Sequence, residues 1–298
     1  MTVPLDELLQ LAGNLAVRAG HMVRDGRATR GVHASATKSS TTDVVTEFDR
    51  ASEALIVGGI IDARPHDGIV GEEGTNTPGT TGINWLIDPI DGTTNFLYGL
   101  PAYAVSIAAC TDDDTPFGRA EVGVVYIPGT DELFTAIRGG GARLNGAAIH
   151  CSATTDLSLA LLGTGFSYLP ERRAAQAQRV AAMLPRVRDL RRFGAAAADL
   201  CYVAAGRLDI YFEEWLGPWD LAAGELIARE AGCLTGGIMV GPRCPPRCSW
   251  RTRICSIRRA GSSPRSTARS ETDLHLASWG AWELASSPSK TTSAFGRQ

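Results

Sequence analysis

Four short apolar runs, each bounded by turn residues, constrain the fold of this chain more than any other feature. They cover residues 84–88, 104–110, 121–127 and 132–137. Runs of this length predict β-strands, and a further strand is predicted at 207–213. Together these runs indicate a protein built around at least one β-sheet.

Helical periodicity precedes and follows these strands. Near the N-terminus, Leu8, Leu11 and Leu15 share one helical face, and Thr46 is placed to cap a second helix. Helices are predicted over 5–24, 46–62, 171–184, 194–205 and 219–232. Because strands and helices are mixed without strict alternation, the sequence favours a layered α/β or α+β fold over a repeat or a simple barrel.

The composition is that of a globular protein with a sizeable core. Of 298 residues, 44% are hydrophobic, and the mean hydropathy is −0.03. No apolar run approaches the length of a membrane span, and the N-terminus lacks the basic and apolar blocks of a signal peptide. We therefore expect no membrane partner and a cytoplasmic location. The net charge of −3 argues against a nucleic-acid partner.

The segment 85–96, WLIDPIDGTTNF, presents two carboxylates directly after an apolar run. Pro89 fixes one backbone angle, and Gly92 permits a sharp turn that lets Asp88 and Asp91 converge. The residues that follow lie at the start of a helix or turn, where free backbone N–H groups can hold a phosphate. The segment therefore combines possible metal ligands with a possible phosphate site.

Three other acidic segments accompany it. The four are KSSTTDVVTEFD (38–49), VGEEG (70–74), WLIDPIDGTTNF (85–96) and PWDLAAG (218–224). Magnesium prefers hard oxygen ligands in near-octahedral geometry and usually keeps several waters. Two such ions can activate a water and stabilise a leaving oxygen. Carboxylates from separate segments, with positions left for water and phosphate, would build such a site.

Each segment alone has an ordinary structural explanation. An Asp-Pro-x-Asp-Gly sequence is usually a solvated turn, and an aspartate such as Asp220 most often caps a helix. Lys38 alone would be a solvated lysine. The five histidines show no ligand spacing, and no Cys-His or Ser-His arrangement indicates a covalent nucleophile.

In their order and spacing, the four segments closely resemble the inositol monophosphatase family of magnesium-dependent, lithium-sensitive phosphatases, in its bacterial inositol-1-monophosphatase branch. WLIDPIDGTTNF resembles the first signature of that family, and WDLAAGELIAREAG resembles the second. The resemblance runs from about residue 5 to residue 237. It implies an α-β-α-β-α sandwich of the inositol monophosphatase and fructose-1,6-bisphosphatase type, a homodimer, and two or three bound Mg²⁺ ions.

The resemblance also assigns metal ligands. Glu72, Asp88 and the backbone carbonyl of Ile90 would hold a first magnesium ion. Asp88, Asp91 and Asp220 would hold a second. These ligands come from three of the four acidic segments.

Catalytic and supporting roles follow from the same resemblance. Glu72, Thr93 and Asp49 would be catalytic, with Thr93 orienting the attacking water. A weaker third metal site would involve Glu72, with Asp43 and Asp49 reaching its waters. Lys38 and Asp43 would support the site.

The remaining assignments concern the substrate. The amides of Gly92 and Thr93 would contact the phosphate, while Asp91, Ala196 and Glu213 would meet sugar or inositol hydroxyls. The chain departs from the family pattern in one place. Directly after the glycine of FGAAAAD the family often has Ser or Thr, whereas this chain has Ala195. The missing hydroxyl could change substrate preference.

Residues 238–298 fit neither the family nor a regular element. They contain ten Arg or Lys against three Asp or Glu and show neither strand nor helix periodicity. Cys244, Cys248 and Cys255 lack the paired spacing of a zinc site. We therefore expect a catalytic domain over 1–237, followed by an atypical basic tail.

Two explanations of this tail remain open. It is either disordered or an out-of-frame translation that replaces the final strand and helix of the family. Codons can be chosen for residues 246–257 such that a neighbouring frame reads ALLVAHPDLFD, a plausible strand followed by a helix start. We favour the second explanation, which sequencing of the gene across this region would test.

The resulting functional hypothesis is magnesium-dependent hydrolysis of a phosphate monoester by an activated water, with inositol 1-phosphate as substrate. Phosphatases on the same scaffold act on fructose-1,6-bisphosphate, histidinol phosphate or 3′-phosphoadenosine nucleotides, so these substrates remain alternatives. Residues 163–170 and the surroundings of Glu213 are expected to decide among them. A hypothesis of another class is a regulatory protein that binds an RNA transcription complex.

Overall fold

Residues 4–38, 43–111, 118–237 and 252–256 are described by a computed structural model. The helices are α1 (Leu5–Arg30), α2 (Glu47–Ala63), α3 (Thr93–Tyr98), α4 (Pro170–Met183), α5 (Ala196–Ala204) and α6 (Pro218–Glu230), with short 3₁₀ turns η1 (Leu157–Leu159) and η2 (Leu184–Arg186). All five helices predicted from periodicity are present, and Thr46 caps α2 as expected. Only α1 differs clearly from its predicted range of 5–24, because the helix extends through a polar segment to Arg30.

The larger sheet has eight strands in the order β10-β9-β8-β7-β6-β5-β3-β4. They are β3 (Gly68–Gly71), β4 (Asn76–Thr77), β5 (Ile83–Asp91), β6 (Ala104–Thr111), β7 (Arg119–Ile127), β8 (Glu132–Ile137), β9 (Gly141–Leu144) and β10 (Ala147–Ile149). Only the β3–β5 pair is parallel. A separate hairpin pairs β1 (Ala34–Thr37) with β2 (Val44–Thr46).

The smaller sheet has five strands in the order β12-β11-β13-β15-β14. They are β11 (Leu161–Thr164), β12 (Asp189–Arg191), β13 (Ile210–Glu214), β14 (Leu234–Gly237) and β15 (Thr252–Ser256). Strand β11 is parallel to both its neighbours, while β15 is antiparallel to β13 and β14.

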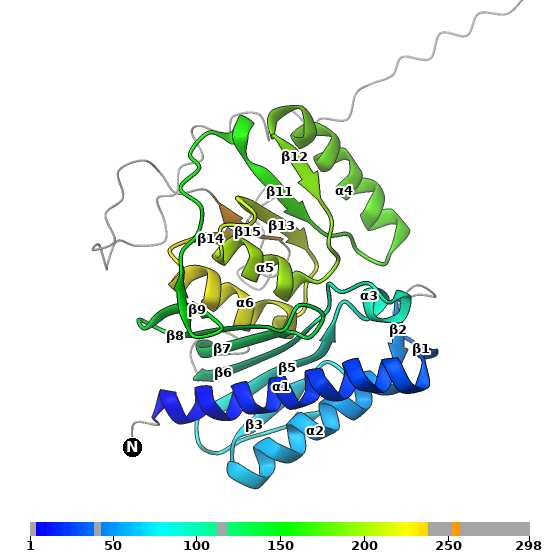
Figure 1. The fold of residues 1–298 in the computed structure, drawn as a ribbon, viewed down its shortest axis with the longest axis vertical. Helices are drawn as coiled ribbons and strands as arrows, with labels where there is room; N and C mark the ends of the chain where they lie inside the picture. The colour runs from blue at the N-terminus through cyan, green and yellow to red at the C-terminus, as the bar shows by residue number, and fades with distance from the viewer. Residues whose placement is uncertain (1–3, 39–42, 112–117, 238–251, 257–298) are drawn as a thin grey trace, which may run out of the picture.

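Helices and sheets alternate in five layers (Figure 1). Helices α1 and α2 cover one face of the larger sheet, α5 and α6 lie between the two sheets, and α4 lies beyond the smaller sheet. The predicted α-β-α-β-α sandwich is therefore confirmed. Strand β5 is covered on both faces, which explains why its sequence is a continuous apolar run rather than an alternating one.

Helix α6 packs closely against strands β6 and β7 of the larger sheet. A side chain at Gly123 of β7 would come within 2.8 Å of the Ala223 carbonyl oxygen of α6. The Ser106 hydroxyl of β6 also donates a hydrogen bond to the Trp219 carbonyl oxygen at 3.1 Å. These contacts hold the first turn of α6, with Asp220, against the end of the sheet.

One strand of the smaller sheet, β15, lies within residues 238–298. No strand was expected there, yet Thr252–Ser256 lies between β13 and β14, with Ile254 opposite both Phe212 and Gly236. The pairing partners are distant in sequence, so a local periodicity could not indicate them. The strand supplies hydrogen-bond partners for the facing edges of β13 and β14, which would otherwise be unpaired. The rest of this tail lies outside the described residues, and its origin stays a prediction.

None of the helices in the described part of the chain is both long enough and apolar enough to cross a membrane.

Candidate active site

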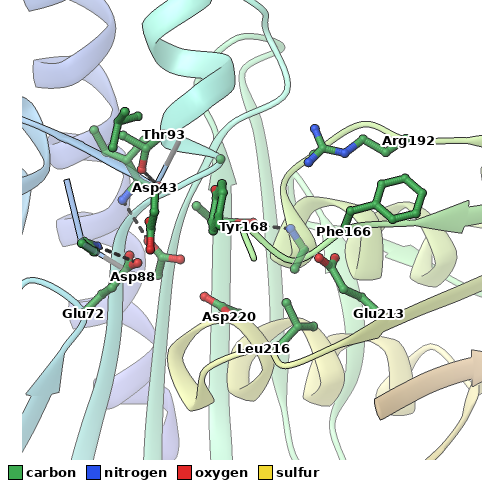
Figure 2. A pocket seen from close by; sticks show the side chains of 17 residues that line it. Asp43, Glu72, Asp88, Thr93, Phe166, Tyr168, Arg192, Glu213, Leu216 and Asp220 are labelled. Atoms are coloured by element: carbon green, nitrogen blue, oxygen red, sulfur yellow. Dashed lines mark hydrogen bonds and ion pairs between the residues drawn. The ribbon is translucent and has the colours of Figure 1, made fainter. Parts of the chain in front are cut away.

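A pocket lies between the ends of the larger sheet and the segments that lead into α4, α5 and α6 (Figure 2). Its acidic lining residues are Asp43, Glu72, Asp88, Asp91, Glu213 and Asp220. Its basic lining residues are Lys38 and Arg192. The pocket is therefore strongly acidic, and its carboxylates come from both halves of the sandwich.

A bulge at the end of β5 brings Asp88 and Asp91 to the same pocket. Side chains of a regular strand alternate between faces, so two residues three positions apart would point in opposite directions. Here Asp88 lies opposite Ser106 and Asp91 lies opposite Ala104, so β5 spans three residue steps where β6 spans two. The extra residue reorients the strand and lets both carboxylates converge.

The turn after Asp91 requires glycine. Gly92 has φ +87° and forms the N-cap of α3. A side chain at this position would also come within 3.0 Å of the Ala195 Cβ and the Gly194 carbonyl oxygen. Gly92 thus permits both the tight turn and the close approach of the segment before α5.

Asp91 caps α5 from another layer of the molecule. The N-cap residue Ala195 offers no side-chain hydrogen bond. Instead, Asp91 Oδ1 accepts from the Ala196 amide at 3.0 Å, and Asp91 Oδ2 accepts from the Ala197 amide at 2.7 Å. A helix without a good N-cap residue is therefore capped by a carboxylate from β5.

Asp49 lies behind the pocket and contacts it through Thr93. The Thr93 hydroxyl is 3.0 Å from Asp49 Oδ1 and 3.1 Å from the Ile90 carbonyl oxygen. Asp49 Oδ2 accepts from the Thr46 amide at 2.7 Å in the capping box of α2. Burial raises the pKa of Asp49, although the hydrogen bonds from Thr46 and Thr93 oppose this rise.

Burial raises the pKa values of four of the pocket carboxylates, those of Asp88, Asp91, Glu213 and Asp220. Burial is the largest cause in each case. It raises the pKa of Asp91 to about 7 and, with repulsion from Glu72 and Asp91, that of Asp220 to about 8. Burial and repulsion from Glu72 raise the pKa of Asp88 well above its usual range, and burial raises that of Glu213 to about 7.

This donor set fits a hard divalent cation. Several anionic oxygens converge in one pocket, where a divalent ion would remove the repulsion between them. Within the described ranges, no group of three or more His, Cys, Asp or Glu side chains is already arranged to hold a metal ion. Glu72 instead accepts from Lys38 Nζ at 2.8 Å, and Asp220 accepts from the Gly217 amide at 2.7 Å. In this arrangement the Glu72 carboxylate is paired with the Lys38 ammonium group.

The pocket gathers all but one of the site residues predicted from sequence. Those that line it are Lys38, Asp43, Glu72, Asp88, Ile90, Asp91, Gly92, Thr93, Ala196, Glu213 and Asp220. Asp49 does not line the pocket but accepts a hydrogen bond from the hydroxyl of Thr93, which does. Their roles as ligands or catalytic groups remain predictions.

Sequence reasoning did not name several other lining residues. Phe166 and Tyr168 fall in the segment 163–170 that was expected to influence substrate choice, whereas Arg192 carried no local signal. In Figure 2 Tyr168 stands between the Asp43 side of the pocket and the Glu213 side. Burial raises the pKa of Tyr168 to about 12, while a hydrogen bond with Thr94 lowers it.

The sequence model of the inositol monophosphatase family matches residues 4–266. The chain belongs to the inositol monophosphatase family. Membership supports a metal-dependent phosphatase activity and confirms the resemblance found in the sequence. The match also continues past residue 237 into the tail.

The individual relatives of this chain include proteins named inositol-1-monophosphatase and proteins named SuhB. Inositol-1-monophosphatase of Mycobacterium leprae is 47% identical over 252 residues, which are 78% of this chain and 85% of that protein. Nus factor SuhB of Vibrio cholerae is 44% identical over 226 residues, 74% of this chain and 83% of that protein. The crystal structure of the extragenic suppressor protein suhB from Bartonella henselae matches with a TM-score of 0.76 and 34% identity, covering 84% of this chain and 94% of that one.

Proposed function

We propose that this chain is a magnesium-dependent phosphatase that hydrolyses inositol 1-phosphate to inositol and phosphate. The observation that carries the proposal is the convergence of the buried carboxylates of Asp88 and Asp91 with those of Asp220 and Glu72 in one pocket. The raised pKa values of Asp88, Asp91 and Asp220 show that ionising these carboxylates in the folded chain is unfavourable. A divalent cation would compensate their negative charges.

Two groups of oxygens would hold the ions. Glu72, Asp88 and the Ile90 carbonyl would bind the first ion, and Asp88, Asp91 and Asp220 would bind the second. Bound magnesium would supply a Lewis acid for the phosphoryl oxygens and lower the pKa of a bound water. Since Asp88 belongs to both groups, it is the residue whose loss should damage the site most.

Thr93 and Asp49 would orient the attacking water. The Thr93 hydroxyl lies within hydrogen-bonding distance of Asp49, so its proton is directed away from the pocket and its oxygen can accept a hydrogen bond from water. Glu72 would then accept the second proton of that water. A third ion would lie near Glu72, with Asp43 and Asp49 contacting its waters.

The other end of the pocket would bind the inositol ring. The amides of Gly92 and Thr93 would contact the phosphate, and Asp91, Ala196 and Glu213 would face the hydroxyl groups. Glu213 accepts a hydrogen bond from the Tyr211 hydroxyl, which fixes its orientation. Fructose-1,6-bisphosphate, histidinol phosphate and phosphoadenosine nucleotides remain the alternative substrates on this scaffold.

Phosphate release from inositol 1-phosphate, measured with and without magnesium, tests the proposal. The wild-type chain should release phosphate only with the ion, and Asp88→Asn should be nearly inactive. The same assay with the alternative substrates ranks them by kcat/KM. A folded wild-type chain that releases no phosphate from any of them would contradict the proposal.

We further propose that lithium inhibits the reaction and that the active form is a cytoplasmic homodimer. Inhibition should be measurable at roughly tens of millimolar lithium. The same concentration of sodium is the control, because it keeps the ionic strength, and therefore the screening of charges, constant. Light scattering of the purified chain gives its oligomeric state. An activity equal in lithium and sodium would exclude the first expectation.

A second candidate function is binding within a transcription complex. It is favoured by one observation, the 44% identity to a protein named Nus factor SuhB. Such a role does not require the pocket carboxylates. An Asp88→Asn variant that loses phosphatase activity but still binds transcription factors would therefore separate the two functions.

A further inference from the structure

Helix α2 carries three buried polar side chains on the face that points toward the pocket. Asp49, Ser52 and Glu53 are spaced by three and four residues, so they share one helical face. Their exposed fractions are 0%, 0% and 5%. Burying polar groups is costly unless hydrogen bonds compensate, so their partners should be informative.

Each of the three binds a different segment of the candidate active site. Asp49 accepts from the Thr93 hydroxyl at the start of α3. Ser52 donates to the Pro89 carbonyl oxygen at 3.0 Å, within the bulge of β5. Glu53 binds the turn between β3 and β4, which contains Glu72. One helix face therefore contacts all three segments that provide the first-ion ligands and Thr93.

Glu53 makes the most extensive of these contacts. Its Oε2 accepts from the Glu73 amide at 2.8 Å, and its Oε1 accepts from the amide and hydroxyl of Thr75 at 3.1 and 2.6 Å. A side chain at Gly71 would come within 2.4 Å of the same carboxylate. Glycine at position 71 of β3 therefore leaves the space that the Glu53 carboxylate occupies.

These contacts fix the direction of the Glu72 side chain. The Glu72 amide donates to the Ile87 carbonyl oxygen of β5 at 3.1 Å, and the next amide, that of Glu73, donates to Glu53. The backbone on both sides of the Glu72 Cα is therefore anchored, once to the sheet and once to α2. A carboxylate on a turn without the second anchor would sample several directions.

We propose that Glu53 is a positioning residue for the cation site: it holds the 72–75 turn so that Glu72 is presented to the ion together with Asp88. The inference rests on the proposed function, since it concerns the same cation. Glu53 does not line the pocket. Its effect passes through the turn.

Glu53→Gln tests this role with little change in shape. The variant keeps one carbonyl oxygen for Thr75 but turns an NH₂ group toward the Glu73 amide, where two donors would face each other. Loss of an outer partner of a metal ligand typically lowers affinity by roughly 10- to 100-fold. We expect magnesium affinity, measured by calorimetry without substrate, to fall in this range. Activity should fall at low magnesium and recover largely at saturating magnesium.

Ile60→Val is the matched control for a purely structural effect. Ile60 is fully buried in the same helix, away from the pocket. This variant should lower the melting temperature and leave magnesium affinity unchanged. If Glu53→Gln also lowers only the melting temperature, with wild-type magnesium affinity, the inference is wrong.

Thr75 provides a second test if Glu53→Gln fails to fold. Thr75→Val removes the hydroxyl donor to Glu53 but keeps the amide, while Thr75→Ser keeps both. We expect a few-fold loss of magnesium affinity in the valine variant, in line with loss of one outer-sphere hydrogen bond, and none in the serine variant. Equal affinities in both variants would overturn the inference. A wild-type chain that binds no magnesium at all would instead overturn the proposed function.

Discussion

Two buried acidic regions of this molecule behave in opposite ways. Asp67, between α2 and β3, is 3% exposed, and Asp88 at the end of β5 is 2% exposed. Burial alone would raise both pKa values. Asp67 nevertheless has a lowered pKa, because hydrogen bonds from Arg64, Thr81 and Trp85 outweigh the effect of burial. Asp88 has a pKa raised well above its usual range by burial and by neighbouring carboxylates.

The difference separates a structural carboxylate from one that we propose is functional. The partners of Asp67 supply a positive charge and two neutral donors, at 2.6 Å from Thr81 and 2.9 Å from the Trp85 indole nitrogen. Asp88 is surrounded by the carboxylates of Glu72, Asp91 and Asp220, and it accepts a hydrogen bond from the Ile90 amide at 3.1 Å. One region is complete within the chain, whereas the other fits a cation from solution.

The largest effect is expected from Asp88→Asn. A bound ion contributes several kcal/mol of transition-state stabilisation, and each 1.36 kcal/mol corresponds to a factor of ten, so kcat/KM should fall by roughly a thousandfold. The metal-free variant should at the same time be at least as stable as the wild type, since a repelling charge is removed. Steady-state kinetics and thermal unfolding in chelator measure the two effects. A variant that is both inactive and strongly destabilised would contradict the comparison.

Asp67→Asn should show the reverse behaviour. The substitution removes the charge that binds Arg64 and leaves the Trp85 indole with a poorer partner. Hydrogen bonds to charged groups contribute about 1.5–3 kcal/mol, so the free energy of unfolding should fall by roughly that amount. Since Asp67 does not line the pocket, kcat/KM at permissive temperature should remain within about twofold of the wild type. Chemical denaturation and the phosphate assay provide the two readings.

The pH dependence of stability should differ between the two regions as well. The pKa values of Asp91 and Asp220 are raised to about 7 and about 8 in the folded chain, so the native state keeps protons that the unfolded chain releases. The free energy of unfolding of the metal-free protein should therefore fall as pH rises from about 4 to about 8. Asp67, with its lowered pKa, contributes stability that is present at neutral pH and is lost as pH falls below about 4.

Thermal unfolding in chelator at about pH 5 and about pH 8 measures this dependence. Each kcal/mol lost should lower the melting temperature by about 2–4 °C in a protein of this size. Magnesium should raise the melting temperature more at the higher pH, where it meets ionised carboxylates. Asp220→Asn should weaken the dependence. A melting temperature that rises with pH in chelator would show that these carboxylates are ionised without a cation.

Local patterns made some parts of this arrangement predictable from the sequence. The start of α2 could be predicted because Thr46 and Asp49 form a capping box within one helical turn. The sequence predicted that Asp88 and Asp91 converge through a sharp turn at Gly92. In the structure a bulge in β5 before that turn brings them together, because strand alternation alone places them on opposite faces. The bulge that brings them together depends on pairing with β6.

Long-range contacts explain what the sequence did not indicate. Strand β15 forms between β13 and β14, and neither partner is close to it in sequence. Arg192 follows the edge strand β12 and enters the pocket only because of how the two sheets are placed. Glu53 looked like any polar residue on an amphipathic helix. Its role follows from hydrogen bonds to residues about twenty positions away.

The smallest effect is expected from Ala195→Ser, which restores the hydroxyl common in the family. A serine at an N-cap ordinarily stabilises a helix by about 0.5–2 kcal/mol relative to alanine. Here Asp91 already accepts from two of the first amides of α5, so the new hydroxyl has fewer donors to satisfy. We expect a gain below about 0.5 kcal/mol in chemical denaturation and a change in KM of a few fold at most.

The same variant also tests how Asp91 is used. When Asp91 binds a cation, its hydrogen bonds to the α5 amides should weaken, and the serine could then replace them. Magnesium should therefore stabilise Ala195→Ser slightly more than it stabilises the wild type. If the serine instead gains a full N-cap contribution in chelator, Asp91 is not the effective cap of α5. The helix would then depend on its own N-terminal residues, and the link between capping and the cation site would be lost.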